Sequence, residues 1–331
     1  MKVSSRSFPM NQFARKYHLV FTLCALCAFV VNFHAQDFRQ VHPGVEYAEV
    51  EHKIGSDPLK INLLRLDLKK VRLDVHHALD RAIGLETTSS IAKRKGAVAA
   101  INAGFFRLDK SEFAGDPVGI FVVDGKTLSE AQNNRVTLVI DNKKNRTDIA
   151  IIRLLPSTNF IFKVGNPNFR PEIAISGVNR EPKDGDVVLF TPEFGPSTRS
   201  KATVAVVMAK CSTKRDHRGF YFGHCSRFEV KENVSDQSIP RDGAVVMFGP
   251  ATGVALSVFS SEVAKLRSQR ERTIYLDTAV FGIDGDTLLP AQPSTDIVSG
   301  VPQLIKDGKI VKASAEKDEE YLINMLDTDA G

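Results

Sequence analysis

Short apolar runs alternate with polar positions and turn residues along most of the chain after residue 40. The stretch KINLLRLDL, residues 60–68, alternates apolar and polar positions as a half-buried β-strand does. The alternation changes phase between Leu63 and Leu64, which predicts a bulge or a shift of register. VRLDVHHAL, residues 71–79, continues the period of two. The pattern therefore predicts a chain dominated by β-strands.

One helix and one buried strand are predicted before the middle of the chain. TTSSIAKRKG, residues 87–96, is typical of a short helix with Thr88 or Ser89 as its N-cap and Gly96 as its end. AVAAI, residues 97–101, follows without a polar side chain, so we expect a strand that is covered on both faces.

Turn signals and composition indicate how these elements are organised. Five Asp-Gly pairs predict β-hairpins, because both central residues of a type I′ turn need positive φ: Asp124-Gly125, Asp184-Gly185, Asp242-Gly243, Asp284-Gly285 and Asp307-Gly308. No low-complexity linker or repeat divides the chain after residue 40. We therefore expect an α+β fold, with β-rich mixed sheets and a few helices, in a single domain over residues 36–331.

Charge and composition argue against nucleic-acid binding. Of the 331 residues, 43% are hydrophobic and 25% charged, which suits a globular protein with a large core. The net charge of +5 comes from 44 basic and 39 acidic residues that are mixed along the chain. A basic face or a nucleic-acid-binding motif is missing from the sequence, so no nucleic-acid partner is expected.

The N-terminus has the pattern of a secretory signal peptide. Arg6, Arg15 and Lys16 precede LVFTLCALCAFVV, residues 19–31, and a more polar stretch follows. The apolar run is shorter than the roughly 20 residues of a membrane span. We expect cleavage near Ala35 or Gln36, which removes residues 1–35. The mature protein is then expected to be secreted, periplasmic or part of the cell envelope, without a stable membrane span. An uncleaved anchor is the alternative.

Two cysteines remain in the expected mature chain. Cys24 and Cys27 lie inside the apolar run of the signal peptide, whereas Cys211 and Cys225 lie in a polar stretch that we interpret as a surface excursion. In an exported protein this pair favours one disulfide, and two free buried thiols are the alternative. The sequence has no H-E-x-x-H zinc motif and no G-x-S-x-G nucleophile motif, so no metal or cofactor is expected.

The stretch INAGFFR, residues 101–107, carries the candidate chemistry. Asn102 supplies hydrogen-bond donors and an acceptor at the end of the predicted strand, and Gly104 allows close approach of a ligand to the backbone. Phe105 can form a sugar platform together with the next residue, and Arg107 suits a phosphate. A capped turn with two core phenylalanines and a surface arginine is the alternative.

Several segments in order resemble the phosphodiester glycosidase family. Asn102-Ala103-Gly104-Phe105-Phe106 is similar to that family's Asn-Gly-Gly-Phe-Phe motif, with alanine in place of the first glycine. Residues 175–195, 238–249 and 296–311 are similar to later segments, the last of these to a Ser-Gly-x-Pro-x-Leu strand and hairpin. The resemblance implies an exported hydrolase that cleaves a sugar-1-phosphodiester of the N-acetylglucosamine type.

The resemblance also assigns roles to single residues. Asn102 and Asp116 are the candidate catalytic residues, although Asp116 before Pro117 also fits a turn-capping role. The candidate substrate contacts are Gly104, Phe105, Arg107, Ser299 and Gly300. The family's Arg-Thr-Ala-Ile-Gly and Asp-Gly-Gly-Gly-Ser segments have no counterpart here, so the resemblance implies a C-terminally incomplete domain with weak or no activity. A non-catalytic envelope or polysaccharide-binding protein is the alternative function.

Overall fold

The structure is a computed structural model of the whole chain. It describes residues 37–131, 135–153, 161–164, 172–215, 221–253, 255–257, 259–261, 274–278, 280–281, 288–289, 294–300, 303 and 305–310. The predicted signal peptide and the Asp284-Gly285 turn lie outside these residues. The chain divides into two compact units, Met1–Asp67 and Leu68–Gly331. Among the described residues of each unit, β-strands outnumber helices, and the described helices are short.

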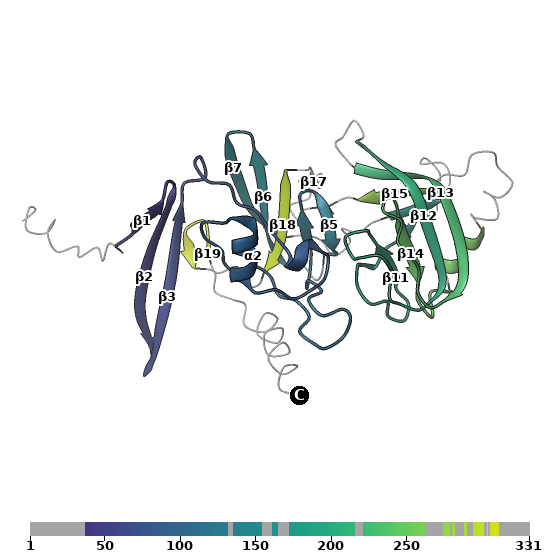
Figure 1. Cartoon of the computed structure of the whole chain (residues 1–331), viewed down its shortest axis with the longest axis horizontal. Coiled ribbons are helices and arrows are strands. Elements are labelled where there is room, and N and C mark those ends of the chain that lie inside the picture. Colours follow the sequence, from purple (N-terminus) through teal and green to yellow (C-terminus); the bar gives the residue numbers. More distant parts are fainter. Residues whose placement is uncertain are drawn as a thin grey trace, which may run out of the picture. The chain divides into compact units, whose positions relative to one another are not determined.

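The first unit contains a three-stranded antiparallel sheet in the order β1-β2-β3 (Figure 1). Its strands are β1 (Arg39–His42), β2 (Val45–Ile54) and β3 (Asp57–Leu66). β2 and β3 pair without interruption along their whole length, so the bulge predicted at Leu63 and Leu64 is wrong. Many side chains of β3 are exposed on either face of the hairpin. A change in the phase of the leucines therefore does not force a change of register.

The second unit contains a five-stranded antiparallel sheet in the order β5-β4-β18-β6-β7. Its strands are β4 (Phe121–Val123), β5 (Lys126–Ser129), β6 (Val136–Lys143), β7 (Arg146–Arg153) and β18 (Thr295–Gly300). The central strand β18 comes from a distant part of the sequence, and all of its residues except Gly300 are buried. The Asp296 carboxylate accepts hydrogen bonds from the Asp124 N–H at 2.7 Å and the Val75 N–H at 3.2 Å.

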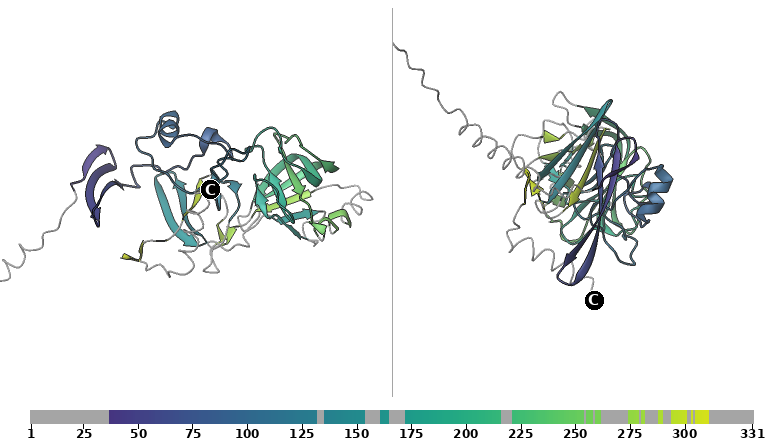
Figure 2. Two further views of the ribbon diagram at one scale, coloured as in Figure 1. Left: turned by 90° about the horizontal axis from the view of Figure 1, so that it is seen from below. Right: turned by 90° about the vertical axis from the view of Figure 1, so that its left-hand side faces the viewer.

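The same unit contains an eight-stranded mixed sheet in the order β10-β11-β14-β12-β13-β15-β8-β9. Only β10 and β11 of this sheet run parallel among the described pairs. Figure 2 shows its green strands curving around an interior. The strands are β8 (Ile161–Val164), β9 (Glu172–Ala174), β10 (Gly177–Val178), β11 (Val187–Phe190), β12 (Ala202–Arg215), β13 (Tyr221–Val234), β14 (Ala244–Phe248) and β15 (Ile274–Thr278).

Alternate residues of β11 and β14 point into two different hydrophobic clusters. One cluster contains Val187, Leu189, Val246 and Phe248. The other contains Val188, Phe190, Val245 and Met247, together with Phe121, Leu128, Ile140 and Val298 of the five-stranded sheet. The two sheets therefore pack on each other through the second cluster, where each fully buried large side chain contributes roughly 1.5–3 kcal/mol.

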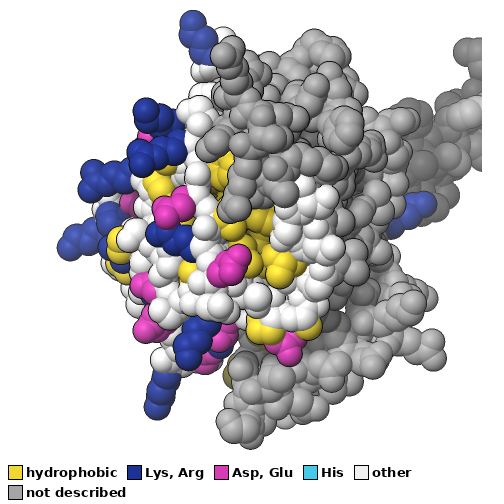
Figure 3. All heavy atoms as spheres, turned by 90° about the vertical axis from the view of Figure 1, so that its right-hand side faces the viewer, with side chains coloured by type: hydrophobic (Ala, Val, Ile, Leu, Met, Phe, Trp, Pro, Cys, Tyr) yellow, Lys and Arg dark blue, Asp and Glu magenta, His cyan; other side chains and the backbone are white. Residues whose placement is uncertain are grey.

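The outer end of this sheet is seen in Figure 3, which faces the side where Figure 1 shows β12 and β13. On the described part of that surface, hydrophobic side chains lie at the centre and charged side chains lie mainly toward the edge. Partly buried side chains that pack on the first cluster include Phe228, Val230 and Leu256.

The predicted helix is confirmed, with a different cap. α2 (Thr88–Lys95) has Thr87 as its N-cap, whose hydroxyl accepts a hydrogen bond from the Ser90 N–H at 3.3 Å. Gly96 ends the helix with φ of 65°, a left-handed conformation that glycine adopts without a steric penalty. A 3₁₀ turn, η1 (Ala78–Asp80), precedes it, and the described residues between 253 and 261 are also helical.

Two of the five Asp-Gly pairs form the predicted hairpin turns. Asp124 and Gly125 have φ of 48° and 74° between β4 and β5. Asp307-Gly308 does the same between β19 (Ile305–Lys306) and β20 (Lys309–Ile310). The hairpin prediction is wrong for Asp184 and Asp242, because the strands that flank each of them are parallel or not adjacent in the sheet. A further described pair is β16 (Val280–Phe281) with β17 (Leu288–Leu289).

The disulfide prediction is confirmed. Cys211 and Cys225 are bonded and lie directly opposite each other in β12 and β13. Residues 211–215 and 221–225 continue these long strands, so the described part of the predicted surface excursion is the far end of a hairpin. A disulfide of this kind is typical of proteins from oxidising compartments.

Removal of the disulfide is expected to destabilise the protein. The bond closes a loop with a sequence separation of 14, which corresponds to about 3 kcal/mol of lost chain entropy in the unfolded state. We therefore expect Cys211→Ala/Cys225→Ala to lower the free energy of unfolding by about that amount, measured by urea denaturation. Reduced wild-type protein is the matched control because it keeps both sulfur atoms. Equal stability of the oxidised and reduced proteins would contradict the prediction.

Candidate functional site

A short antiparallel backbone contact brings most of the predicted site residues together. The Arg107 N–H donates to the Asp116 carbonyl at 2.8 Å, and the Val118 N–H donates to the Phe105 carbonyl at 2.9 Å. Phe106 and Pro117 form the bridge between these two contacts. Phe105, the candidate sugar platform, and Arg107, the candidate phosphate contact, therefore lie beside Asp116, the candidate catalytic carboxylate.

The end of β18 continues this contact on its other side. The Ser299 N–H donates to the Ile120 carbonyl at 3.2 Å, and the Ser299 hydroxyl donates to the Val118 carbonyl at 3.0 Å. A Cβ atom at Gly104 would lie 3.0 Å from the Ser299 carbonyl oxygen. Gly104 and Ser299, which the sequence analysis assigned to one site, are therefore packed together, and Gly300 ends the same strand.

Gly119 makes this close packing possible. Its φ is 93°, and a Cβ atom there would lie 2.6 Å from the Ser299 hydroxyl oxygen and 3.0 Å from Cδ of Arg135. Arg135 is itself buried, and its Nη1 donates to the Val118 carbonyl at 3.2 Å. Burial lowers the pKa of the Arg135 guanidinium. A side chain at position 119 therefore has no room.

The predicted buried strand at residues 97–101 is wrong. These residues form no strand and are exposed, as is Asn102. The Asn102 side-chain oxygen accepts a hydrogen bond from the Thr88 hydroxyl in the first turn of α2. An apolar sequence indicates a preference for burial, but burial also requires a neighbouring segment to cover it. The described part of the chain does not provide such a segment.

Arg107 is held by two carboxylates. Its Nη1 donates to Glu181 at 2.9 Å, and its Nε donates to Asp109. Its guanidinium also lies 5.9 Å from the centre of the Phe113 ring. A phosphate that binds Arg107 therefore has to compete with these carboxylates, which the sequence analysis did not anticipate.

Asp116 is partly buried and has an unusual proton affinity. Its pKa is raised from 3.8 to about 7, first by burial and then by the negative charge of Glu130. Three cations act in the opposite direction: Arg180, Arg107 and Lys183. A carboxyl group with a pKa near 7 can both donate and accept a proton at neutral pH, which is the property of a general acid or base.

A buried ion pair that the sequence analysis missed lies next to this carboxyl group. Glu130 at the end of β5 accepts from Nε of Arg180 at 2.7 Å and from the Val178 N–H at 2.9 Å. Arg180 also donates to Asp186 at 2.6 Å. No spacing rule connects residues 130 and 180, because only the packing of the two sheets brings them together. The sequence signal for this pair was the family resemblance of residues 175–195, which include Arg180.

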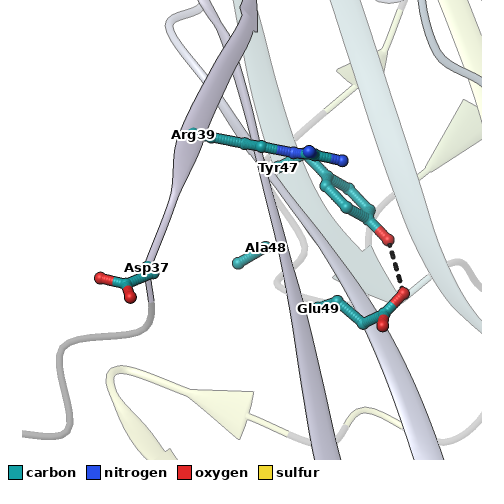
Figure 4. Close-up of a pocket in the computed structure, with 5 residues that line it drawn as sticks. All are labelled: Asp37, Arg39, Tyr47, Ala48 and Glu49. Atoms are coloured by element: carbon teal, nitrogen blue, oxygen red, sulfur yellow. Dashed lines mark hydrogen bonds between the residues drawn. The ribbon is translucent and has the colours of Figure 1, made fainter.

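The first unit carries a separate surface pocket of about 260 Å³ (Figure 4). It is lined by Asp37, Arg39, Tyr47, Ala48 and Glu49. The Tyr47 hydroxyl oxygen lies 2.7 Å from the Asn62 side-chain oxygen and 3.2 Å from the Glu49 carboxylate, and its single proton is shared between these two acceptors. These polar groups therefore bond to one another within the sheet. None of the residues predicted from the sequence to form the site lies in this pocket.

Neither a cluster of metal ligands nor a membrane-spanning helix is present among the described residues. Within that part of the chain, no three His, Cys, Asp or Glu side chains are grouped in a way that holds a metal ion. Likewise, no described helix has the length and apolar character needed to cross a bilayer.

Comparison with known proteins identifies relatives in fold only. No protein-family model matches the chain, and no curated protein matches it. A hypothetical protein from Synechocystis is 18% identical with a TM-score of 0.54, over 86% of this chain and 47% of that chain. A second structure, described as "Putative exported protein" from Burkholderia pseudomallei K96243, is 18% identical with a TM-score of 0.54, over 74% of this chain and 50% of that chain. The chain thus spans about half the length of these solved proteins.

Substitution of Gly119 tests the packing at the end of β18. We expect Gly119→Ala to lower the free energy of unfolding by about 2 kcal/mol or more, because the new Cβ is both strained and blocked by Ser299. Gly253→Ala is the control, since nothing lies within 4 Å of a Cβ there. Chemical denaturation measures both. Equal effects of the two substitutions would show that position 119 is not closely packed.

The stability of Asp116→Asn relative to wild type is expected to depend on pH. Asp116 contributes stability fully below its ordinary pKa of 3.8, and that contribution is lost as the pH rises through about 7. Asparagine does not ionise, so the free energy of unfolding of the variant relative to wild type should rise from pH 5 to pH 7 and then level off.

Asp109→Asn is the control for this measurement. The pKa of Asp109 is lowered to about 2 by hydrogen bonds from Ser111 and Arg107. Its contribution is complete above pH 5, so the difference between this variant and wild type should stay flat from pH 5 to pH 8. A flat difference for Asp116→Asn as well would disprove the raised pKa.

Proposed function

We propose that the protein is an exported hydrolase of the glycosidase class that cleaves a sugar-1-phosphodiester. The observation that carries this proposal is the placement of the Asp116 carboxyl group, with its pKa of about 7, directly across a backbone contact from Arg107. Such hydrolysis needs a group that takes a proton from water and a cation that binds the phosphate. The resemblance of residues 102–106 to the phosphodiester glycosidase motif supports the same proposed activity.

In this proposal each predicted residue has a physical role. Asp116 accepts a proton from water as the water oxygen bonds to the anomeric carbon. The bond between that carbon and the phosphate oxygen breaks, and the phosphate monoester leaves as an anion bound by Arg107, which exchanges one of its carboxylate partners for it. Asn102 and the Gly104 backbone contact the sugar, and the exposed ring of Phe105 forms a platform for it. Ser299 and Gly300 form the side of the substrate site that faces Gly104. No metal or cofactor enters the proposal.

Two features support the proposed location. The disulfide is typical of oxidising compartments, and one of the similar solved structures is described as an exported protein. Together with the signal-peptide pattern, these features support a secreted, periplasmic or cell-envelope protein. Its partner is then a glycan or a sugar phosphodiester.

A non-catalytic polysaccharide-binding protein is the second candidate. The exposed rings of Phe105 and Phe106 favour it, because neighbouring exposed aromatic side chains form stacking platforms for sugars. This function needs the aromatic surface and does not need a proton on Asp116. The two candidates are therefore separated by the effect of Asp116.

Turnover of a defined substrate tests the proposal. We expect the protein to release N-acetylglucosamine slowly from a methyl phosphodiester of N-acetylglucosamine 1-phosphate. Asp116→Asn should reduce that rate by about 100-fold or more, since it removes the group that takes the proton. The control Asp184→Asn changes an exposed turn and should not alter the rate. Calorimetric binding of the intact substrate without any turnover would instead support the polysaccharide-binding function.

Substitution of Asn102 separates a ligand contact from a structural cap. The side chain is exposed and bonds only to Thr88 among the described residues, so Asn102→Ala should reduce turnover with little change in melting temperature. Thr88→Val removes the same hydrogen bond from the other side and should leave turnover nearly unchanged. A large fall in melting temperature for Asn102→Ala would identify a structural role and remove Asn102 from the site.

A further inference from the structure

The Arg107 guanidinium is held on its Nε side by neighbours in its own loop. The Asp109 carboxylate accepts from Nε, and the centre of the Phe113 ring lies 5.9 Å from the guanidinium carbon. The other hydrogen bond of the guanidinium to the described residues runs from Nη1 to Glu181 at 2.9 Å. A phosphate that binds Arg107 through Nη1 and Nη2, as paired N–H donors do, therefore has to take the place of Glu181.

The two carboxylates on Arg107 are held very differently. Asp109 also accepts from the Ser111 N–H at 2.9 Å and from the Ser111 hydroxyl at 2.6 Å. These two bonds, together with Arg107, lower the pKa of Asp109 to about 2. Glu181 has no further side-chain partner among the described residues, and its side chain is 51% exposed. Asp109 is therefore anchored in its loop, whereas Glu181 is the carboxylate that an incoming anion can displace.

The backbone at Glu181 is fixed, so the exchange needs only a rotation of the side chain. The Glu181 carbonyl accepts from Nη1 of Arg180 at 3.0 Å. Arg180 is itself bonded to Glu130 at 2.7 Å and to Asp186 at 2.6 Å. Pro182 follows directly and restricts the chain further. An exposed ion pair such as Arg107 with Glu181 is weak, so a phosphate can replace the glutamate without moving the loop.

The negative charge that remains near Arg107 decides which phosphate is favoured. A phosphodiester carries one negative charge, whereas a phosphate monoester carries nearly two above neutral pH. Asp109 stays ionised beside Arg107, and a displaced Glu181 stays close because its backbone is fixed. Electrostatic repulsion grows with the charge of the ligand, so Glu181 opposes the binding of a monoester more than that of a diester.

We propose that Glu181 is a specificity-determining residue, whose carboxylate occupies the phosphate position on Arg107, yields it to a phosphodiester and competes with the phosphate monoester product for it. This inference rests on the proposed function, because it takes Arg107 as the phosphate contact. It goes further by assigning the preference for a singly charged phosphate to one residue outside the motif of residues 102–106. Glu181 acts through Arg107 and does not touch the reacting atoms.

The affinity for two unreactive phosphate probes tests the role of Glu181. Dimethyl phosphate represents the singly charged diester, and methyl phosphate at pH 8 represents the doubly charged monoester. Phosphorus NMR measures both dissociation constants in about 0.15 M salt. We expect Glu181→Gln, which keeps the shape of the side chain, to lower the dissociation constant of methyl phosphate by about two- to fivefold. The dissociation constant of dimethyl phosphate should fall by less.

Asp184→Asn is the matched control. It removes one negative charge from the same segment, and Asp184 is exposed and makes no described contact with Arg107. Both dissociation constants should stay nearly unchanged in this variant, because water and salt screen the charge of an exposed carboxylate. Arg107→Gln should abolish the binding of both probes. Circular dichroism checks that every variant folds.

The outcomes separate the role of Glu181 from the proposed function. If Arg107→Gln does not weaken probe binding, or if no variant binds either probe, Arg107 is not the phosphate contact and both proposals fail. If Arg107→Gln abolishes binding but Glu181→Gln only matches Asp184→Asn, the role of Glu181 is overturned and the phosphate contact stands. Weaker binding in Glu181→Gln would also overturn it, because Glu181 would then orient Arg107 for the phosphate.

Discussion

The insertion of β18 between β4 and β6 is the constraint on which the rest of the second unit depends. This strand comes from residues 295–300, yet it pairs with strands near residues 121 and 140. The buried Asp296 carboxylate secures it by accepting two backbone hydrogen bonds, and the Ser299 hydroxyl secures its other end by donating to Val118. Without β18 the sheet would lose its central strand, and the wall beside Gly104 would be absent.

The electrostatics of the candidate site depend on how the five-stranded and eight-stranded sheets pack on each other. Glu130 directly follows β5 of the five-stranded sheet, and Arg180 follows β10 of the eight-stranded sheet. Their ion pair buries a negative charge near Asp116, which together with burial raises the pKa of that carboxyl group. Paired buried charges cost desolvation energy, and the hydrogen bonds that Glu130 accepts from Arg180 and from the Val178 N–H offset part of that cost.

The sequence predicted the features that depend on neighbouring residues and failed where distant segments decide. The helix at residues 88–95, the turn at Asp124 and the disulfide follow from caps, positive φ and cysteine pairing, which are local or compositional signals. The apolar run at residues 97–101 has the pattern of a buried strand, but the described chain holds nothing that covers it. The Glu130–Arg180 pair could not be predicted from the sequence for the same reason, because its two residues meet only through tertiary packing.

The proposed function depends on a carboxyl group, Asp116, that exchanges its proton near neutral pH. Carbon-13 NMR of labelled aspartate side chains measures this directly, with Asp116→Asn used to assign the signal. We expect the Asp116 carboxyl to titrate with a pKa of about 7, and we expect Glu130→Gln to lower this pKa by removing the neighbouring negative charge. An Asp116 pKa near the ordinary value of 3.8, unchanged by Glu130→Gln, would contradict it.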